Sequence, residues 1–553
     1  MLSRGTWRRI SGLTFRRASP LHPVNRRFTP MKSITKSGWI LSISIGSAVT
    51  LHSISGLVSP LNSHTIMLEP FMSATSNEPK TVIYTELVVP KHLPIRVTLF
   101  RILYLVFNFL PVVITFPLWW WFSNTKTVNH IEWNPSSESW WLSLLRYRME
   151  HGGVLFIKLA QWISSRYDVF PPDICYSLSR LQSRVTAHSL QHTKQSFKSS
   201  FGIDMDIVIN LNETPIGIGA IGQVYKGVLK ADGEAIAIKV LHPGILEPLL
   251  ADLYIITCAA QFLDRFSQLK PLSLPEEVET FAYMLLSQLD LRIEAENYWM
   301  FKRNLKGWTQ LRVPDVRKNW IAKDVLVESL EPGVHLRQVL GVGKGEFDHE
   351  LLELGVRAFL QMCLKDNFGH ADLHPSNILI TFTPPLSSKS IDTKLVDSFL
   401  NRPTGDSLTS LYEAGYKPRL TLVDCGIVSN LSEYSLMTLK EVFAAGIEFD
   451  GAKIGSLLVE KCRSPQLVKD PTGFKTKVAG LFQSLKLDNE GQLMLSQVHT
   501  GLILEKFMAL LREHHLHMPG DFAALAIAAV LVEGCARRLR SDIDLVPLLT
   551  DYL

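Results

Sequence analysis

An α+β fold of two lobes is predicted by three observations: two strand-like runs around a turn, two polar motifs that follow later in a fixed order, and a helical carboxyl-terminal segment. The run QVYKGVLK follows a glycine-rich turn, and EAIAIK follows Asp232 and Gly233, which mark a hairpin. From Glu433 to Leu553 apolar residues recur at helical spacing. These patterns indicate a strand-rich lobe that precedes a largely helical lobe.

Length and charge limit the class of protein. The 553 residues suffice for two to four domains, and a hydrophobic content of 46% supplies a core. The first 68 residues contain nine Lys or Arg and no acid, whereas the remaining 48 basic and 52 acidic residues sum to −4. The body of the chain therefore gives no support for nucleic-acid binding. Six scattered cysteines without zinc spacing are interpreted as reduced core thiols.

The amino-terminal segment, residues 1–35, contains seven arginines among Ser, Thr and Leu, with an apolar face from Trp7, Leu13 and Phe15. This composition is typical of a mitochondrial transit peptide, and a disordered basic tail is the alternative. Residues 36–101 are predicted to form a poorly ordered linker.

Residues 102–121, ILYLVFNFLPVVITFPLWWW, form the most apolar stretch. About 20 uncharged residues at ~1.5 Å rise would cross a ~30 Å hydrocarbon core, so we predict a transmembrane or membrane-embedded helix. A tryptophan cluster, residues 119–121, resembles an interface anchor. Pro111 and Pro117 leave open a hairpin in the membrane interface or a buried amphipathic helix.

A glycine loop occupies the turn before the first strand. Gly217, Gly219 and Gly222 fit G-x-G-x-x-G, and Val224 follows. A dinucleotide fold would need a helix after the last glycine, whereas a strand follows here. Strand, glycine turn, strand, hairpin and A-I-K is the order of a protein-kinase nucleotide lid, in which Lys239 would reach the phosphates.

Two catalytic motifs come later, in the order that a kinase requires. In NFGHADLHPSNIL, His370 and Asp372 fit H-x-D, and Asn377 lies five residues after Asp372. Asp424 begins DCG, which matches D-F-G. An aspartate at position 372 can position or deprotonate a nucleophile, while Asn377 and Asp424 are predicted magnesium ligands.

Other candidates receive structural interpretations. The LVDSF run at 395–399 lacks the glycine of D-F-G and falls in a Pro- and Ser-rich insertion, near 383–418, that we expect to be a mobile loop. His374 is interpreted as structural rather than as a base. The histidines at 514, 515 and 517 lack the spacing of a ligand set, and we expect a solvated helix end there.

A helix before the glycine loop would present Lys158 and Gln161 on one face. This K-x-x-Q run, the following W-x-S-x-R-x-D-x-F-P and then P-I-G-x-G-x-x-G-Q-V-Y-K resemble the UbiB or aarF-domain family of atypical kinases, in particular its mitochondrial second subgroup in animals. The resemblance implies a bilobal protein-kinase-like fold: a helical extension over 140–205, an N-lobe over 206–330 and a C-lobe over 331–553.

The resemblance also assigns roles around the cleft. It implies that Lys158 and Gln161 lie over the active site, and that Glu294, on a long helix beginning at Pro275, is the ion-pair partner of Lys239. Gln288 stands where the family has a carboxylate, which predicts weaker docking of the extension unless its amide bonds Lys158 or Gln161. The family's alanine-rich loop is replaced here by glycines.

The expected cofactors are ATP and Mg²⁺, and the expected reaction is phosphoryl transfer to water or a small molecule. The resemblance implies a role in coenzyme Q or lipid metabolism at the inner mitochondrial membrane, with membrane lipid and coenzyme Q precursors or biosynthetic enzymes as partners. DVLVESLEPGV resembles the hinge between lobes, and Glu328 there is given no chemical role. A nucleotide-sensing pseudokinase scaffold is the alternative, whereas one candidate span cannot line a transporter pathway.

Overall fold

The computed structural model describes residues 66–67, 86–87, 95–125, 139–166, 169–181, 187–266, 270–343, 345–385, 393–462, 465–483, 500–516, 548 and 550–552. All of them belong to one compact unit, Thr65–Leu553. The predicted transit peptide lies outside the described residues. Of the predicted linker, the structure describes two short paired strands, β1 (Ile66–Met67) and β2 (Glu86–Leu87), and the beginning of the first helix.

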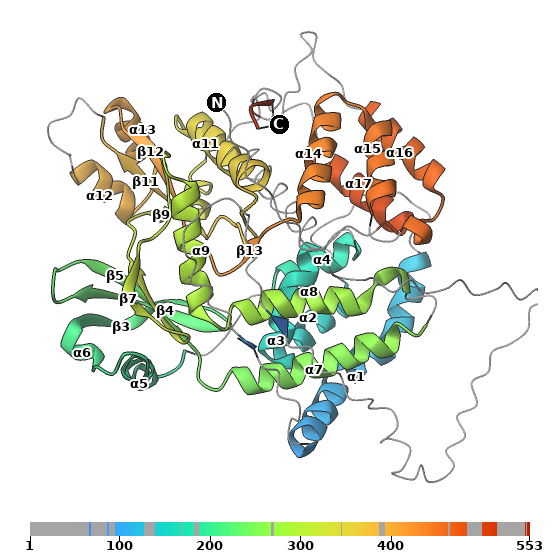
Figure 1. Cartoon of the computed structure of the whole chain (residues 1–553), viewed down its shortest axis with the longest axis horizontal. Coiled ribbons are helices and arrows are strands. Elements are labelled where there is room, and N and C mark those ends of the chain that lie inside the picture. Colours follow the sequence, from blue (N-terminus) through green and yellow to red (C-terminus); the bar gives the residue numbers. More distant parts are fainter. Residues whose placement is uncertain are drawn as a thin grey trace, which may run out of the picture. The chain divides into compact units, whose positions relative to one another are not determined.

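Four helices build the extension that precedes the main sheet (Figure 1): α1 (Ile95–Thr125), α2 (Trp140–Gly152), α3 (Val154–Ser165) and α4 (Pro172–Ser179). Gly153 separates α2 from α3 with φ 107°, a conformation that L side chains rarely adopt. Trp119 of α1 is buried and stacks on Trp141 of α2 with ring centroids 4.5 Å apart. Trp119 is therefore a packing residue, whereas Trp121 is 70% exposed.

A five-stranded sheet forms the strand-rich lobe, in the order β3 (Ile209–Ile218), β4 (Gly222–Leu229), β5 (Ala235–Leu241), β8 (Val325–Ser329) and β7 (Val316–Ile321). Helices α5 (Leu190–Phe201) and α6 (Met205–Val208) precede it. Ile236, Ile238 and Val240 of β5 pack in one cluster with Phe197 of α5. Since side chains alternate along a strand, Lys239 projects from the opposite face, as the predicted lid requires.

Three helices follow the first strands: α7 (Leu246–Leu263), α8 (Leu274–Ser287) and α9 (Leu291–Asn304), with a short 3₁₀ turn η1 (Lys270–Leu272) before α8. The prediction of one long helix from Pro275 was wrong. The helix ends before Asp290, whose side chain caps α9 by accepting a hydrogen bond from the Arg292 N–H at 3.1 Å. A short carboxylate is favoured at such a cap, which restarts the helix in a new direction.

The C-lobe begins with α10 (Leu336–Val339), α11 (Asp348–Leu360) and a π-helical turn, η2 (Gln361–Lys365). Its small sheet has the order β6 (Leu311–Arg312), β12 (Lys417–Leu422), β11 (Ile378–Thr383) and β9 (Val334–His335), and β10 (Gly369–His370) pairs with β13 (Val428–Ser429). The register pairs Ile378 with Leu422. Asn377 and Asp424 therefore lie at the same end of neighbouring strands.

The insertion between β11 and β12 is not the loop that we expected, because α12 (Thr393–Asn401) and α13 (Gly405–Glu413) form within it. The LVDSF run belongs to α12, where Phe399 is fully buried and meets Phe382 of β11 edge to face at 4.9 Å. Apolar residues spaced three or four apart in this segment supply the packing face that its Pro and Ser content obscured.

Helices α14 (Glu433–Ile447), α15 (Gly451–Lys461), α16 (Pro471–Gln483) and α17 (Thr500–Glu513) lie together (Figure 1), with the turn η3 (Pro465–Leu467) between α15 and α16. The predicted helical segment is thus confirmed over these residues. His514 is buried rather than solvated, and its Nδ1 lies 2.7 Å from the Lys469 carbonyl oxygen. His517 lies outside the described residues.

The cysteines divide by burial. Cys175, Cys363 and Cys425 are buried, as expected, and Cys462 is partly buried. Cys258 is exposed and was wrongly interpreted as a core residue, and Cys535 lies outside the described residues. Burial raises the pKa of Cys363 and Cys425, so both remain protonated thiols.

Candidate active site

One cleft of about 1190 Å³ lies among the strand-rich lobe, the C-lobe and the extension. It is large enough for a ligand of nucleotide size. The structure brings every predicted site residue to its wall: Lys158, Gln161, Gly217, Gly219, Gly222, Val224, Lys239, Glu294, Asp372, Asn377 and Asp424.

The glycine loop joins β3 to β4 at the edge of the cleft, and its three glycines differ in what they require. A Cβ at Gly222 would lie 2.6 Å from the Val240 carbonyl oxygen, so only glycine fits there. A Cβ at Gly217 would meet nothing within 4 Å, and one at Gly219 would make an ordinary 3.4 Å contact with the Gly222 oxygen. The last glycine is therefore fixed by strand packing, while the other two leave room for alanine.

At the centre of the cleft lies a cluster that we call the cleft triad: Lys239, Glu294 and Asp424. Lys239 Nζ lies 2.9 and 2.8 Å from the two carboxylate oxygens of Glu294 and 2.6 Å from Asp424 Oδ1. Burial by itself lowers the pKa of Lys239, but the charges of Asp424 and Glu294 outweigh it and raise the pKa. Lys239 in turn holds the pKa of Asp424 below its usual range. The Lys239 ammonium group thus pairs with two carboxylates.

Asp424 is held in a specific conformation by α9. Its φ is 59°, in the left-handed region, and its backbone N–H donates to the Tyr298 hydroxyl at 2.9 Å. Asn297 Nδ2 donates to the Cys425 carbonyl oxygen at 2.8 Å. The helix that carries Glu294 therefore also fixes the backbone of the DCG motif.

Sequence reasoning missed Asn297 and Tyr298. Both are buried and follow Glu294 by three and four residues. Residues with that spacing share one helix face, so the position of Glu294 could have indicated them.

The catalytic loop is ordered by His370, which is buried. Its Nε2–H donates to the Val423 carbonyl oxygen at 3.2 Å, and its Nδ1 accepts from the Asp372 N–H at 3.2 Å. Asn377 Nδ2 donates to the Asp372 carbonyl oxygen at 3.0 Å. These bonds fix the backbone on both sides of the Asp372 carboxylate, which lines the cleft.

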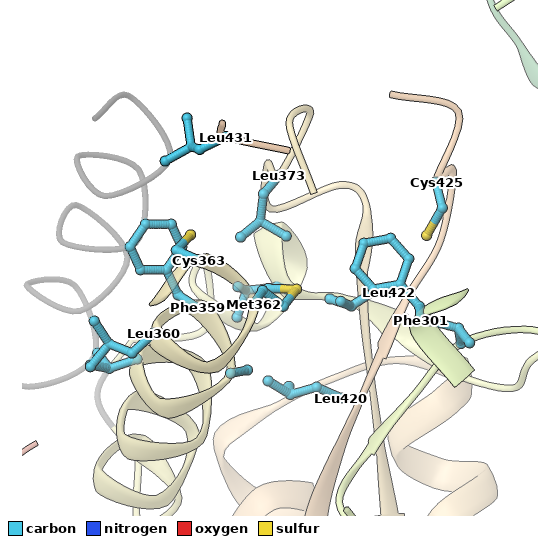
Figure 2. Packing of buried hydrophobic residues seen from close by; sticks show 14 of the residues in the cluster. Phe301, Phe359, Leu360, Met362, Cys363, Leu373, Leu420, Leu422, Cys425 and Leu431 are labelled. Atoms are coloured by element: carbon cyan, nitrogen blue, oxygen red, sulfur yellow. The ribbon is translucent and has the colours of Figure 1, made fainter. Parts of the chain in front are cut away.

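Hydrophobic packing also supports the loops that carry Asp372 and Asp424. Figure 2 shows Leu373 and Cys425, the chain neighbours of Asp372 and Asp424, within one buried cluster that also includes Leu422 and Phe301. Leu373 is only 6% exposed. Two polar residues at the cleft surface are thus anchored by apolar neighbours behind it.

The side-chain oxygens of Asn377 and Asp424 fit Mg²⁺, which prefers carboxylate and carbonyl oxygens. The Asn377 amide nitrogen is used by Asp372, which leaves its Oδ1 for a ligand. Within the described residues, Asp424 Oδ2 has no hydrogen-bond partner, and no group of three His, Cys, Asp or Glu side chains could hold a metal by itself. Such a pair of oxygens suits a cation that takes its remaining ligands from phosphate and water.

Residues 180–458 match the ABC1 atypical kinase-like domain. The chain is also 32% identical to the mitochondrial ABC1 family protein C21C3.03 of Schizosaccharomyces pombe, over 82% of this chain and 71% of that one. The chain belongs to the ABC1 atypical kinase-like family.

Further relatives come from yeast and bacteria. The mitochondrial ABC1 family protein YPL109C of Saccharomyces cerevisiae is 32% identical over 82% of this chain and 74% of its own length. A probable protein kinase UbiB of Aeromonas hydrophila is 28% identical over 74% of this chain and 69% of its own length. A solved structure of the Mycobacterium tuberculosis Rv3197–erythromycin complex has a TM-score of 0.44 at 16% identity, over 66% of this chain and 83% of that one.

The extension of this ABC1-family chain reaches the cleft through α3. Ala160 is fully buried in the core, while Lys158 and Gln161 on either side line the cleft. The charge of Lys158 contributes to the lowered pKa of Asp424, after the larger effect of Lys239. An alanine at position 160 therefore leaves the polar pair at the cleft.

Gln288 Nε2 donates to the Met284 carbonyl oxygen of its own helix. The structure describes no hydrogen bond from Gln288 to Lys158 or Gln161, so this amide does not replace the family's carboxylate in holding the extension. A buried ion pair joins α8 to the end of α3 instead, and we call Arg166 and Glu277 the seam pair.

The seam pair is bidentate, since both Nη1 and Nη2 of Arg166 donate to the Glu277 carboxylate, the latter at 3.2 Å. The Arg166 guanidinium also lies 5.0 Å from the centroid of the Trp162 ring. Side-chain exposures are only 2% for Arg166 and 9% for Glu277. Arg166 and Trp162 belong to the W-x-S-x-R-x-D-x-F-P run, whereas their partner on α8, Glu277, was not indicated by any motif.

Glu328 was given no chemical role from the sequence, yet its side chain lies in the cleft. It pairs with Ala237 across β8 and β5, and its Oε2 is buried with no hydrogen-bond partner among the described residues. Burial, with the nearby charge of Glu294, raises the pKa of Glu328 to about 8. This ABC1-family cleft therefore holds a protonated carboxyl group at neutral pH.

Proposed function

We propose that the chain binds ATP with Mg²⁺ and transfers a phosphoryl group to water or to a small molecule, in support of coenzyme Q or lipid metabolism in the mitochondrion. The observation that carries this proposal is the cleft triad, which lies in one cleft with Asp372 and Asn377. The names of the relatives, mitochondrial ABC1 proteins and UbiB kinases, support the location and the reaction class.

Each polar residue of the cleft then has a role. Lys239 contacts the phosphates while Glu294 holds its ammonium group in place, and Asn377 and Asp424 hold the metal. When bound, Mg²⁺ supplies positive charge that screens the phosphate oxygens. Asp372 orients the attacking hydroxyl or water and accepts its proton.

The acceptor is proposed to be small because the extension covers the cleft. Lys158 and Gln161 of α3 share the cleft wall with Asp372, so a folded protein surface would collide with α3 before reaching that carboxylate. Water and small molecules meet no such obstacle.

Asp424→Asn tests the metal assignment. Asparagine tolerates the left-handed conformation as aspartate does, so the variant removes the charge and keeps the backbone. We expect loss of Mg²⁺-dependent ATP binding, measured by calorimetry, with a melting temperature close to that of wild type. Unchanged binding and turnover would contradict the role of Asp424.

A nucleotide-sensing scaffold is the second candidate. Phosphate release from ATP, measured on the purified chain with cardiolipin-containing vesicles, distinguishes the enzyme from the scaffold. If the protein is an enzyme, Asp372→Asn lowers the rate by about 100-fold, the typical contribution of a positioned general base. Equal rates of phosphate release for wild type and Asp372→Asn would favour the scaffold.

The proposed membrane partner contacts α1, one of two described helices that are long and apolar enough to cross a bilayer. Large hydrophobic side chains are exposed along it: Leu99, Phe100, Leu103, Val106, Phe107, Leu110, Val113, Ile114, Leu118 and Trp121. From 102 to 121 the segment has no charged residue. This face is suited to the acyl region of a lipid surface.

We propose that α1 lies in the interface rather than across the bilayer, because its other face is attached to protein along most of its length. Arg101 pairs with Asp252 of α7, and Asn108 Nδ2 donates to the Arg148 carbonyl oxygen of α2 at 2.9 Å. Trp119 stacks on α2 eleven residues further along α1. A spanning α1 would draw the charged residues of α2 into hydrocarbon.

Vesicle flotation tests this partner. Phe107→Glu places a charge on the exposed face and should reduce the lipid-bound fraction several-fold, whereas Met437→Glu, at an exposed apolar site on α14, should not. Equal flotation of the two variants would contradict lipid contact through α1.

A further inference from the structure

His242 follows β5 directly and is hydrogen-bonded to two backbone carbonyl groups of the glycine loop. Its Nε2 lies 3.0 Å from the Gly219 carbonyl oxygen, and its own N–H donates to the Ile221 carbonyl oxygen at 2.8 Å. The Gly219 N–H donates to the Gly222 carbonyl oxygen at 2.9 Å. Both ends of the turn are therefore tied to the sheet, and His242 is the one side chain in these contacts.

The proton on His242 Nε2 follows from elementary chemistry. A carbonyl oxygen only accepts, so His242 Nε2 carries a proton and donates it to the Gly219 carbonyl oxygen. On the other side of the ring, His242 Nδ1 lies 2.8 Å from His188 Nδ1, so one of these two nitrogens donates to the other. His188 Nε2 lies 2.9 Å from the Thr193 hydroxyl. We call Thr193, His188, His242 and the Gly219 carbonyl group, which are linked by these hydrogen bonds, the histidine chain.

The far end of the histidine chain is anchored in the core. Gln223, which is fully buried, accepts from the His188 N–H and donates to the His188 carbonyl oxygen, both at 3.1 Å. Burial, and next the neighbouring His242 and His192, lower the pKa of His188 to about 4. His188 therefore stays neutral at physiological pH.

The bond to Gly219 decides where the next amide points. In a trans peptide the C=O and the following N–H point in opposite directions. Gly219 and Ala220 line the cleft, whereas His242 is not part of its wall. Since the Gly219 oxygen points to His242, the Ala220 N–H points away from it, and no hydrogen bond in the described part of the chain uses that N–H.

We propose that His242 is a positioning residue that fixes the Gly219–Ala220 peptide, so that the Ala220 N–H donates to a phosphate oxygen of the bound nucleotide. This inference rests on the proposed ATP binding. It explains how a loop whose first two glycines are not held by side-chain packing still presents a donor in a fixed direction.

The test compares a ligand that has phosphates with one that lacks them. Affinities of ATP with Mg²⁺ and of adenosine are measured by calorimetry for wild type, His242→Leu and His242→Gln. Leucine removes the donor at similar volume, and glutamine retains one. We expect His242→Leu to weaken ATP binding by 10-fold or more, a loss typical of a hydrogen bond to a charged group, and to leave adenosine binding unchanged. His242→Gln should recover most of the ATP affinity.

His192→Leu is the matched control, because the His192 ring contacts His188 but lies outside the histidine chain. It should bind both ligands as wild type does. Equal weakening of ATP and adenosine in His242→Leu would mean a merely structural role, and unchanged ATP binding would likewise overturn the inference. If wild type binds ATP in both of these cases, only the role of His242 fails. If wild type binds no nucleotide, the proposed function fails with it.

Discussion

The seam pair and the cleft triad are both ion clusters, yet they differ in burial and in their number of carboxylates. The seam pair joins one arginine to one carboxylate through two hydrogen bonds, and both side chains are at most 9% exposed. The cleft triad joins one lysine to two carboxylates, and the Asp424 side chain is 50% exposed. The first is a closed contact between helices, whereas the second opens onto a cleft.

This difference indicates what each cluster can do. A planar guanidinium suits a fixed bidentate contact, while an ammonium group is a compact charge that can change partners. Asp424 Oδ2 has no hydrogen-bond partner among the described residues, so under the proposed function this oxygen would contact the metal ion while Lys239 remains paired with Glu294. One ion cluster thus joins two helices, whereas the other leaves a carboxylate oxygen open to the cleft.

The largest effect on stability is expected when the seam pair is broken. Glu277→Ala leaves the Arg166 charge buried beside Trp162, and removal of one partner of a buried pair costs about 3–5 kcal/mol. Urea unfolding should show this loss, whereas Glu279→Ala, two residues further along α8 and exposed, should change stability by less than about 0.5 kcal/mol. Similar losses of stability for Glu277→Ala and Glu279→Ala would contradict a special role of the seam pair.

The next effect concerns activity. Glu294→Gln keeps the shape of the side chain but cannot hold Lys239 as an ion pair, so we expect phosphate release from ATP to fall by about 100-fold. Glu296→Gln, on the same helix but outside the cleft wall, serves as the control. Full activity of Glu294→Gln would show that the cleft triad is structural like the seam pair.

A third prediction concerns the electrostatics of the cleft. Burial raises the pKa of Glu328 from its ordinary 4.5 to about 8, so across that interval the folded protein binds a proton that the unfolded chain has lost. The stability of wild type relative to Glu328→Gln should therefore fall as pH rises through this window. Thermal melts of both proteins from pH 5 to pH 8 measure it, and a constant difference would mean that the carboxyl has an ordinary pKa.

Several site residues could be predicted because their motifs record backbone constraints. Lys239 lies within a strand of strand-forming residues, β5, and Asp372 and Asn377 keep a five-residue spacing that one loop requires. The insertion and the break before α9 could not be read in this way. A capping Asp290 and a buried Phe399 gain their meaning from the helices and strands that they contact.

The sequence by itself determined the order of the lobes, the glycine loop and the catalytic motifs, because these depend on local periodicity and on fixed spacing along the chain. Only the tertiary structure decided that Glu277 holds the extension, that Tyr298 holds Asp424 and that His242 holds Gly219. Each of these contacts joins residues from separate elements, and no local pattern encodes which distant side chain will satisfy a buried charge or a polar backbone group.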